Sequence, residues 1–286
     1  RDRLRSRGLG DVYKRQVCDT LRNSLDSIIL SSCIGLVATT IYGNYYFVYS
    51  AIYGVLLVIG NALSGSVGNS ISCETPEKNY EDMRKFQFLF SWVTTTCTIC
   101  LATMYQPFMR LWAGKELMLS DKDMLLFCLY FYLINMNNIR NQYINGAGLW
   151  DKLKASYILE AGGNLVLNIV LGRAWGITGI LLATIITIFV FNYVYRTHVL
   201  FANYFHGESE KRFSMDQFQY ALLAIVLVGS MFLFSKVIPG GELVHLVVCV
   251  LLSAVVAGFA YFAFFHKTDR YAYAKSKIYQ IVCRKM

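Results

Sequence analysis

The stretch LVHLVVCVLLSAVVAGFAYFAFF, Leu243–Phe265, contains no Asp, Glu, Lys or Arg. As a helix it rises about 1.5 Å per residue, which is enough to cross the roughly 30 Å hydrocarbon core of a bilayer. Two further runs, Ile177–Phe191 and Phe218–Ser235, also lack charged residues. Because lipid offers no partner to backbone N–H and C=O groups, such runs must form helices or a closed barrel. Their hydropathy is continuous rather than alternating, which argues against a barrel and predicts an all-α transmembrane helix bundle.

The composition of the whole chain agrees with an integral membrane protein. Hydrophobic residues make up 56% and charged residues 16%, whereas a soluble domain carries roughly 25% charge. The net charge of +9 would raise the question of nucleic acid in a soluble protein. Here the basic residues lie between apolar runs, so we expect a basic rim that touches anionic lipid and no nucleic-acid binding.

Outward from the quoted stretch, hydropathy predicts about eight transmembrane helices. A GRAWG turn at Gly172–Gly176 precedes the sixth helix, and a Pro-Gly-Gly turn precedes the eighth. The third helix is expected to end at Pro107. Tyrosines near the helix ends are expected to be interfacial anchors: Tyr42, Tyr45, Tyr46, Tyr105, Tyr143, Tyr193 and Tyr195. The expected helices are 25–37, 45–67, 86–105, 124–144, 155–171, 177–195, 218–237 and 243–265.

Lys and Arg residues are concentrated in alternate loops of this series. The positive-inside rule places the richer set of loops in the cytoplasm, and the C-terminus with it. The richer set holds Lys78, Arg84, Lys85, Lys152, Lys154, Arg196, Lys211, Arg212, Lys267, Arg270, Lys275, Lys277, Arg284 and Lys285. The poorer set holds Arg110, Lys115, Lys122, Arg173 and Lys236.

No motif for catalysis or cofactor binding is found along the chain. There is no P-loop and no GxSxG, and the four histidines are scattered. Cys97 and Cys100 form a CxxC, but it lies within an apolar run without His or carboxylate neighbours. We therefore expect neither an enzyme nor a bound cofactor or metal, and the cysteines are expected to act as small apolar residues.

Polar residues at membrane depth are the informative ones, because they are costly there and usually face a cavity or one another. Two consecutive predicted helices carry polar stripes at i, i+4, i+8 spacing, which places each stripe on one helix face. The first stripe is Asn137, Asn141 and Asn145, flanked by Asn138 and Arg140. The second stripe is Glu160, Asn164 and Asn168. We expect the two stripes to face each other or a shared aqueous cavity.

Three charged residues are predicted within membrane-spanning helices. Arg140 and Glu160 lie at similar depth, and they form either a structural ion pair or a cavity in which Arg140 binds a diphosphate. Arg140 is the only basic residue expected well inside a helix. Asp26 is either a proton or cation site or a residue near the inner rim, and Glu160 is a second candidate for ion coupling.

Four stretches resemble the C-terminal lobe of polysaccharide-biosynthesis flippases, members of the multidrug, oligosaccharidyl-lipid and polysaccharide exporter superfamily. They begin DSIILSSCIG (Asp26–Ser70), YQPFMRLWAG (Tyr105–Met118), GAGLWDKLKA (Gly146–Ala155) and EAGGNLVLNI (Glu160–Thr187). The resemblance implies a lobe of about six helices over residues 17–204, and two further helices with a basic cytoplasmic tail over 205–286. The first sixteen residues, RDRLRSRGLGDVYKRQ, look like a sequencing or cloning artefact, the alternative being a basic juxtamembrane arm.

The resemblance also implies an activity. Such proteins flip polyprenyl-diphosphate-linked oligosaccharides across the bacterial cytoplasmic (inner) membrane by alternating access, for surface polysaccharide biosynthesis. The cavity residues would be Arg140, Asn137, Asn141, Asn145, Glu160, Asn164 and Asn168. The expected partners are the lipid-linked substrate, membrane lipids, a missing N-terminal lobe that supplies further cations, and polysaccharide assembly proteins. The main alternative is cation-coupled multidrug or toxin extrusion. A glycan polymerase or glycosyltransferase and a purely structural assembly subunit are the remaining alternatives.

Overall fold

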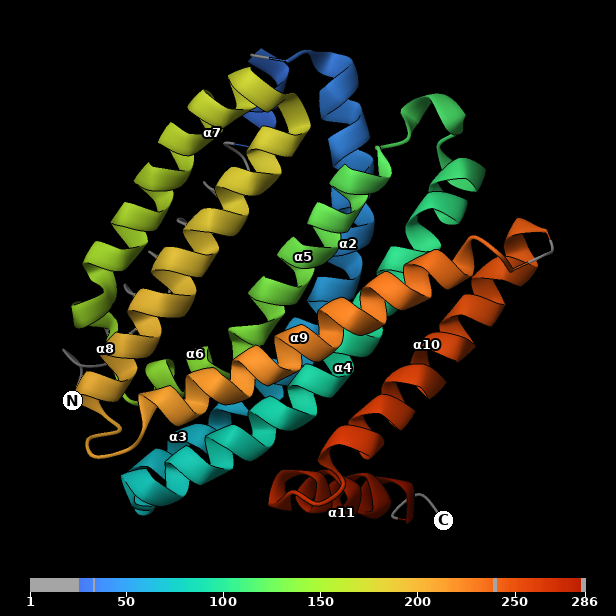
Figure 1. The fold of residues 1–286 in the computed structure, drawn as a ribbon. Coiled ribbons are helices and arrows are strands. Elements are labelled where there is room, and N and C mark those ends of the chain that lie inside the picture. The colour runs from blue at the N-terminus through green and yellow to red at the C-terminus, as the bar shows by residue number, and fades with distance from the viewer. Residues whose placement is uncertain (1–25, 33, 239–240, 284–286) are drawn as a thin grey trace.

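The computed structural model describes residues 26–32, 34–238 and 241–283. Nearly all of them are helical and none forms a strand, which confirms the predicted all-α bundle. Residues 26–32 are helical, and Figure 1 shows the helices that follow. These are α2 (Leu36–Ala62), α3 (Ser64–Cys73), α4 (Pro76–Trp112), α5 (Asp121–Met136), α6 (Asn138–Gly146), α7 (Trp150–Thr187), α8 (Arg196–Asn203), α9 (Glu210–Ser235), α10 (Glu242–Phe265) and α11 (Asp269–Cys283). A 3₁₀-helix, η1 (Lys115–Leu117), precedes α5, and a π-helix, η2 (Ile188–Tyr195), joins α7 to α8.

Several helices begin at residues suited to the role. Thr75 precedes α4, where its hydroxyl accepts a hydrogen bond from Lys78 N at 3.4 Å, and Pro76 occupies the first helical position. Ser120 and Ser209 accept from backbone N–H groups in the first turns of α5 and α9, each at 3.1 Å. These side chains satisfy N–H groups that the helix itself leaves without partners.

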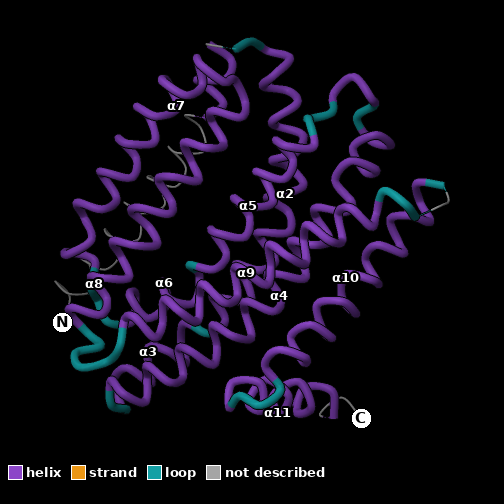
Figure 2. Tube along the Cα trace, viewed as in Figure 1, coloured by secondary structure: helices purple, strands orange, loops and turns teal. Residues whose placement is uncertain are grey.

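The connections between helices gather at two ends of the bundle (Figures 1 and 2). One end holds the α3–α4, α6–α7, α8–α9 and α10–α11 connections, and we call it the basic end because these are the loops rich in Lys and Arg. The other end holds the α4–α5 and α9–α10 connections and the turn within α7. Five described helices are long and apolar enough to cross a membrane. The chain is therefore a multi-pass membrane protein.

Helix α7 consists of two helical arms that reverse direction at a kink. Gly176 has φ 61° and ψ −134°, a conformation that side chains with a Cβ rarely adopt. Past this residue the chain runs back antiparallel through η2 and α8 (Figure 1). A Cβ at Gly179 would lie 1.9 Å from Leu171 O, so the two arms of the turn approach closely. The predicted turn at Gly172–Gly176 is thus present, and residues 150–203 form a helical hairpin.

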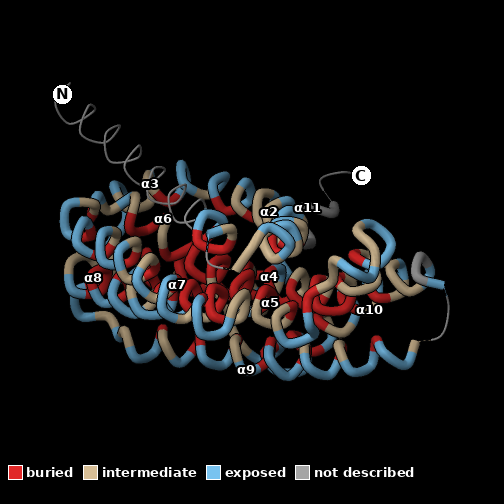
Figure 3. The backbone as a smooth tube through the Cα atoms, turned by 90° about the horizontal axis from the view of Figure 1, so that it is seen from above, coloured by how far each residue is buried: buried red, intermediate tan, exposed pale blue. Residues whose placement is uncertain are grey.

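Helix α4 lies at the centre of the bundle. In the most apolar 18-residue segment of α4, 61% of the residues are buried. In the corresponding segment of the helical run Leu36–Cys73 the share is 17%. Viewed from above, buried residues form a band inside the molecule while the outer faces of α2, α7, α9 and α10 are exposed (Figure 3). Those exposed faces carry large apolar side chains such as Val58, Phe218 and Phe259, as expected where lipid is the solvent.

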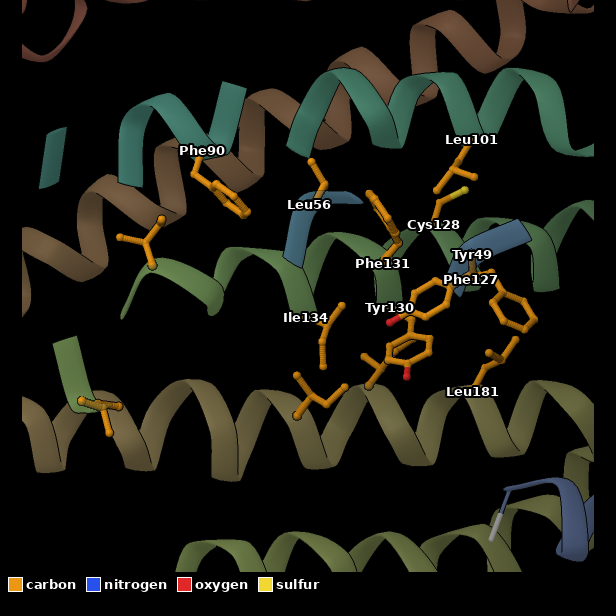
Figure 4. Packing of buried hydrophobic residues seen from close by; sticks show 14 of the residues in the cluster. Tyr49, Leu56, Phe90, Leu101, Phe127, Cys128, Tyr130, Phe131, Ile134 and Leu181 are labelled. Carbon is orange, nitrogen blue, oxygen red and sulfur yellow. The ribbon is translucent and has the colours of Figure 1, made fainter. Parts of the chain in front are cut away.

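Aromatic side chains fill much of the core between α2, α5 and α4 (Figure 4). Tyr49 stacks on Tyr130 with ring centroids 4.7 Å apart, and Phe131 meets Tyr49 edge-on at 5.8 Å. The prediction that tyrosines act as interfacial anchors is wrong for four of them, because they are buried inside the bundle: Tyr42, Tyr45, Tyr105 and Tyr143. The hydroxyls of Tyr42, Tyr45 and Tyr105 donate hydrogen bonds within the protein, as in Tyr105 donating to Tyr45 O at 3.1 Å.

Several helix boundaries differ from those expected. The second expected helix, 45–67, begins earlier, at Leu36, and is interrupted after Ala62, where α3 follows. Helix α4 continues through Pro107 to Trp112 rather than ending at the proline. The fourth predicted helix is interrupted at Asn137, which separates α5 from α6. The basic tail forms α11, which was expected only as a tail. Residues 1–25, which include the first sixteen, lie outside the described part of the chain.

Candidate functional site

The hairpin of α7, η2 and α8 carries a line of buried polar side chains. Glu160, Asn164 and Asn168 lie one helical turn apart on α7, with 4%, 0% and 0% of their surfaces exposed. Their stripe faces the returning arm rather than lipid. Because each helical residue rises about 1.5 Å, the three span about 12 Å along the helix axis.

Asp26 lies at one end of this line and is 2% exposed. Its carboxylate accepts hydrogen bonds from Asn168 Nδ2 at 2.6 Å, Tyr42 Oη at 3.2 Å and Thr184 Oγ1 at 3.5 Å. Asn168 is two helical turns from Gly176, so Asp26 belongs to the half of the bundle opposite the basic end. It is therefore not near the rim formed by the basic loops.

Asn164 connects this carboxylate to the middle of the hairpin. Its Oδ1 accepts from Asn168 Nδ2 at 3.0 Å, and its Nδ2 donates to the hydroxyls of Thr184 at 3.2 Å and Thr187 at 3.4 Å. Asn168 Oδ1 is buried and receives no hydrogen bond from the described residues. The carboxylate of Asp26, the amide of Asn168 and the hydroxyl of Thr184 thus lie together in one buried polar cluster.

Glu160 is paired with Arg196, the first residue of α8. Arg196 Nη2 contacts Glu160 Oε2, and both residues are 4% exposed. Arg196 Nε also donates to Ser156 Oγ at 3.1 Å, and the guanidinium lies 3.9 Å from the centroid of the Tyr157 ring. The expectation that Arg196 is a loop residue was wrong, and so was the expectation that Arg140 is the only basic residue deep in a helix. Arg84 on α4 is buried as well.

Arg140, on α6, is 1% exposed and reaches the same hairpin. Its Nη1 donates to Thr197 Oγ1 at 2.9 Å and Tyr193 O at 3.1 Å, and its Nη2 donates to Asn192 Oδ1 at 2.7 Å and Asn141 Oδ1 at 3.1 Å. Within the described chain these acceptors are all neutral, so Arg140 forms no ion pair with Glu160. Arg140 Nε is buried without a hydrogen-bond partner among the described residues.

The asparagine stripe of α5 and α6 divides between the protein interior and its surface. Asn137 is 2% exposed and donates to Leu133 O at 2.9 Å, with its Oδ1 unpaired among the described residues. Asn138 packs against Gly60, and its Oδ1 accepts from Gln142 Nε2 at 3.4 Å. Asn141 and Asn145 are half-buried. The structure thus joins Arg140 and Asn141 to the hairpin, but it does not bring Asn137 or Asn145 there.

Helix α3 presents a polar surface beside α6. Its sequence SGSVGNSISC exposes hydroxyl and amide side chains, including Ser64, Ser66 and Asn69, while Val67 is buried. The two helices pack closely, since a Cβ on Gly146 of α6 would lie 3.7 Å from Gly68 Cα. An exposed polar face within a helical run long enough to span the membrane indicates contact with water rather than with lipid.

Some polar residues of the site were missed at the level of sequence. Asn192, Arg196 and Thr197 come from η2 and α8, while Thr184 and Thr187 come from α7. The i, i+4 spacing of Asn192 and Arg196 was the available signal, because it places both on one helix face. Arg196 was instead placed in a loop because the sixth helix was expected to end at Tyr195.

A separate cavity of about 440 Å³ opens between the ends of α4, α5, α9 and α10, opposite the basic end. Its charged and titratable lining residues are Arg110, Asp121, Lys236 and His245. Lys236 Nζ lies 2.7 Å from Asp121 Oδ2 and holds the pKa of that carboxyl below its usual range. The cavity does not touch the polar line of the hairpin.

The chemistry of the hairpin is that of charge held in the membrane interior. No group of three or more His, Cys, Asp or Glu side chains within the described ranges is placed to hold a metal ion. Cys97 and Cys100 are free thiols within α4. Comparison with known protein families, curated proteins and solved structures finds no match to this chain.

Proposed function

We propose that this chain is one lobe of a transporter that flips polyprenyl-diphosphate-linked oligosaccharides across the bacterial cytoplasmic membrane. The observation that carries the proposal is the buried line of charged and amide side chains along the α7–η2–α8 hairpin. Charged residues at membrane depth are costly and are typically kept for substrate or ion pathways. A purely structural bundle would gain more from apolar side chains at these positions.

The substrate class rests on the sequence resemblance together with the polar groups that the structure offers. A diphosphate and many sugar hydroxyls cannot cross hydrocarbon without replacement of their hydration. Exposed hydroxyls and amides on α3, with the half-buried Asn141 and Asn145 on α6, supply such groups at the basic end. We infer that this face forms one wall of the substrate passage, while the lipid tail stays in the bilayer.

Arg140 is the residue we assign to the diphosphate. The neutral acceptors that hold it, Asn192, Thr197 and the Tyr193 carbonyl, make weaker hydrogen bonds than charged phosphate oxygens would. Exchange of these acceptors for a diphosphate releases the α6 contact with η2 and α8. Substrate binding would thereby change the packing of the hairpin, as alternating access requires.

We assign ion coupling to Asp26, whose buried carboxylate lies against the amide of Asn168 and the hydroxyls of Tyr42 and Thr184, and we keep Glu160 as the second candidate. The Asp26 carboxylate lies against Asn168, whose buried Oδ1 has no donor within the described residues, and against Thr184. These oxygens suit a proton or a monovalent cation. We place the basic end and the C-terminus in the cytoplasm, with a second lobe and polysaccharide assembly proteins as partners.

Cation-coupled extrusion of small cationic compounds is the second candidate, and the buried carboxylate of Asp26 is the observation that favours it. It predicts resistance to cationic dyes and drugs on overexpression. Extrusion does not require Arg140, since a guanidinium repels a cationic substrate. Arg140 therefore separates the two proposals.

The test uses the chain with any upstream segment of its native reading frame, reconstituted in proteoliposomes. The probe is a polyprenyl-diphosphate-linked disaccharide with a radiolabelled sugar, and transport is read as label that an externally added glycosidase can release. The variants are Arg140→Met and Arg140→Lys, and the matched control is Arg173→Met, an exposed arginine at the opposite end.

We expect Arg140→Met to lower flipping at least tenfold, Arg140→Lys to lower it less, and Arg173→Met to leave it unchanged. Equal amounts of each protein in the vesicles separate a loss of transport from a loss of folding. Flipping by Arg140→Met at the wild-type rate would remove this arginine from the mechanism. Absence of flipping in the wild type, with dye extrusion present, would favour the second candidate.

A further inference from the structure

Helix α11 is held at the level where α10 leaves the bundle. Only three residues separate Phe265, the last of α10, from Asp269, the first of α11. The turn is fixed by Thr268, whose N donates to Phe265 O at 2.9 Å and whose hydroxyl accepts from Tyr271 N at 3.3 Å. Figure 1 shows α11 lying across the bundle at the basic end rather than continuing α10.

One face of α11 is anchored to the bundle. Arg270 Nη1 lies 2.9 Å from Asp216 Oδ1 on α9, and the other oxygen of Asp216 accepts from Arg84 Nε on α4 at 2.8 Å. Ala274 is fully buried, and the Tyr271 ring stacks on Trp92 at 6.3 Å. The helix therefore keeps a fixed orientation relative to α4, α9 and α10.

The remaining described surface of this corner is basic. Lys267 in the turn and Lys275 and Lys277 on α11 are exposed. The Nζ atoms of Lys277 and of Lys85 on α4 each lie 5.7 Å from the centroid of the Tyr273 ring. Asp269 is the exposed acid of the corner, while Asp82 is bound by Lys85 at 3.0 Å. The three exposed lysines thus outnumber the one exposed acid.

The last turns of α10 are strongly apolar and exposed. Phe259 is 71% exposed, Phe262 49% and Phe264 72%. Within a few residues along the chain the surface passes from exposed aromatic rings to exposed ammonium groups. A phospholipid carries complementary groups in the same spatial order, because its apolar acyl chains are followed by a negatively charged phosphate.

We propose that the α10–α11 corner binds the headgroup of an anionic phospholipid from the leaflet at the basic end. The acyl chains lie against the exposed phenylalanines of α10, and the negatively charged headgroup is attracted to the ammonium groups of Lys267, Lys275 and Lys277, the last two of which flank α11 on opposite sides. The Arg270–Asp216–Arg84 chain connects this lipid contact to α4 and α9. This site is independent of the proposed transport of oligosaccharides.

The test is lipid binding to the full chain purified in maltoside micelles. Native mass spectrometry measures the dissociation constants of phosphatidylglycerol and phosphatidylcholine for the wild type and for Lys267→Gln/Lys275→Gln/Lys277→Gln. The matched control is Lys152→Gln/Lys154→Gln, two exposed lysines at the same end on α7. Thermal unfolding of each variant checks that the fold is kept, which surface Lys→Gln changes should allow.

We expect the wild type to bind phosphatidylglycerol at least tenfold more tightly than phosphatidylcholine, and the triple variant to lose most of that preference. The control should keep it, and added salt should weaken it. A preference that survives in the triple variant, or that the control loses equally, would overturn the proposal. Displacement of the lipid by millimolar inorganic phosphate would also overturn it, since the site would then recognise free phosphate.

Discussion

The α7–η2–α8 hairpin and the α4–α10 contact are both buried helix pairings, but they use polarity differently. The hairpin buries an ion pair, Glu160 with Arg196, and receives a third charge from Arg140. The α4–α10 contact uses neutral hydroxyls, with Tyr261 Oη 3.1 Å from Thr95 Oγ1 and 3.2 Å from Ser91 Oγ. Around these hydroxyls the second pairing is aromatic and aliphatic.

The difference distinguishes the α4–α10 contact, which serves as a structural scaffold, from the α7–η2–α8 hairpin, which is the candidate site. Neutral hydroxyl pairs and close packing are enough to hold two helices together in a membrane. Buried charges add a large desolvation cost for little net stability, so the three charged residues that meet at this hairpin need another reason. The proposed transport of a charged substrate or ion would supply that reason. The following variants test the contrast between the two pairings.

The largest effect is expected at the buried ion pair. Arg196→Met leaves the Glu160 carboxylate buried without its partner, and it should lower the free energy of unfolding by about 3–5 kcal/mol. Thermal unfolding in micelles measures the change. Glu160→Met/Arg196→Met should recover most of the loss. In contrast, Lys154→Met at the exposed Lys154–Asp151 pair should cost less than about 1 kcal/mol. If Arg196→Met lowers the free energy of unfolding no more than Lys154→Met does, Glu160 and Arg196 do not form a buried ion pair.

The close approach of the two hairpin arms gives the next effect. In Gly179→Ala the added Cβ would meet Leu171 O, so the arms must separate, at a cost of about 1–3 kcal/mol. Gly229→Ala on α9, where a Cβ meets nothing within 4 Å, is the matched control and should be neutral or slightly stabilising. Unfolding midpoints of the two variants should differ accordingly, and equal midpoints would contradict the packing of the turn.

A smaller effect is expected in the α4–α10 contact. Tyr261→Phe removes hydrogen bonds to Ser91 and Thr95 but keeps the ring, so it should lower stability by about 1 kcal/mol. Transport should be unchanged, because this pairing serves as scaffold. A transport defect in Tyr261→Phe without loss of stability would break the proposed division between scaffold and site.

The smallest effect concerns pH at the end opposite the basic end. Lys236 depresses the pKa of Asp121, so this pair stabilises the fold above the ordinary carboxyl pKa and ceases to do so as the pH falls through the depressed value. Both side chains are exposed, so the contribution is at most about 0.5 kcal/mol. Unfolding midpoints at pH 7 and pH 3 should differ slightly less in Lys236→Gln than in the wild type. An unchanged difference would mean that the pair contributes nothing.

Hydropathy alone located most of the helices, because the lipid-facing sides of α9 and α10 must be apolar whatever they pack against. The Gly172–Gly176 turn and the polar stripe of α7 were also accessible, since both follow from local sequence. The residues that pair with that stripe could not be predicted from local sequence. Arg196 opposes Glu160 only because the hairpin is antiparallel at this register, which local periodicity does not specify.

Single polar residues and helix irregularities were likewise beyond the sequence pattern. Asn192 is one amide within an apolar run, and its pairing with Arg140 depends on the tertiary contact between α6 and η2. The break at Asn137 falls where the apolar α5 meets the polar α6, and helical periodicity does not specify such a break. Helix α11 was missed because its charged residues satisfied the expectation of a basic tail, although Ala274 and Tyr271 give it a buried face.

The π-helix at Ile188–Tyr195 has a consequence for movement. A π-helical segment is underwound relative to an α-helix, so restoring α-helical hydrogen bonding would rotate everything after it about the helix axis. Such a twist would carry Arg196 away from Glu160 and Thr197 away from Arg140. The hairpin therefore contains a point at which rotation about the helix axis, without any bend, can uncouple both buried contacts at once.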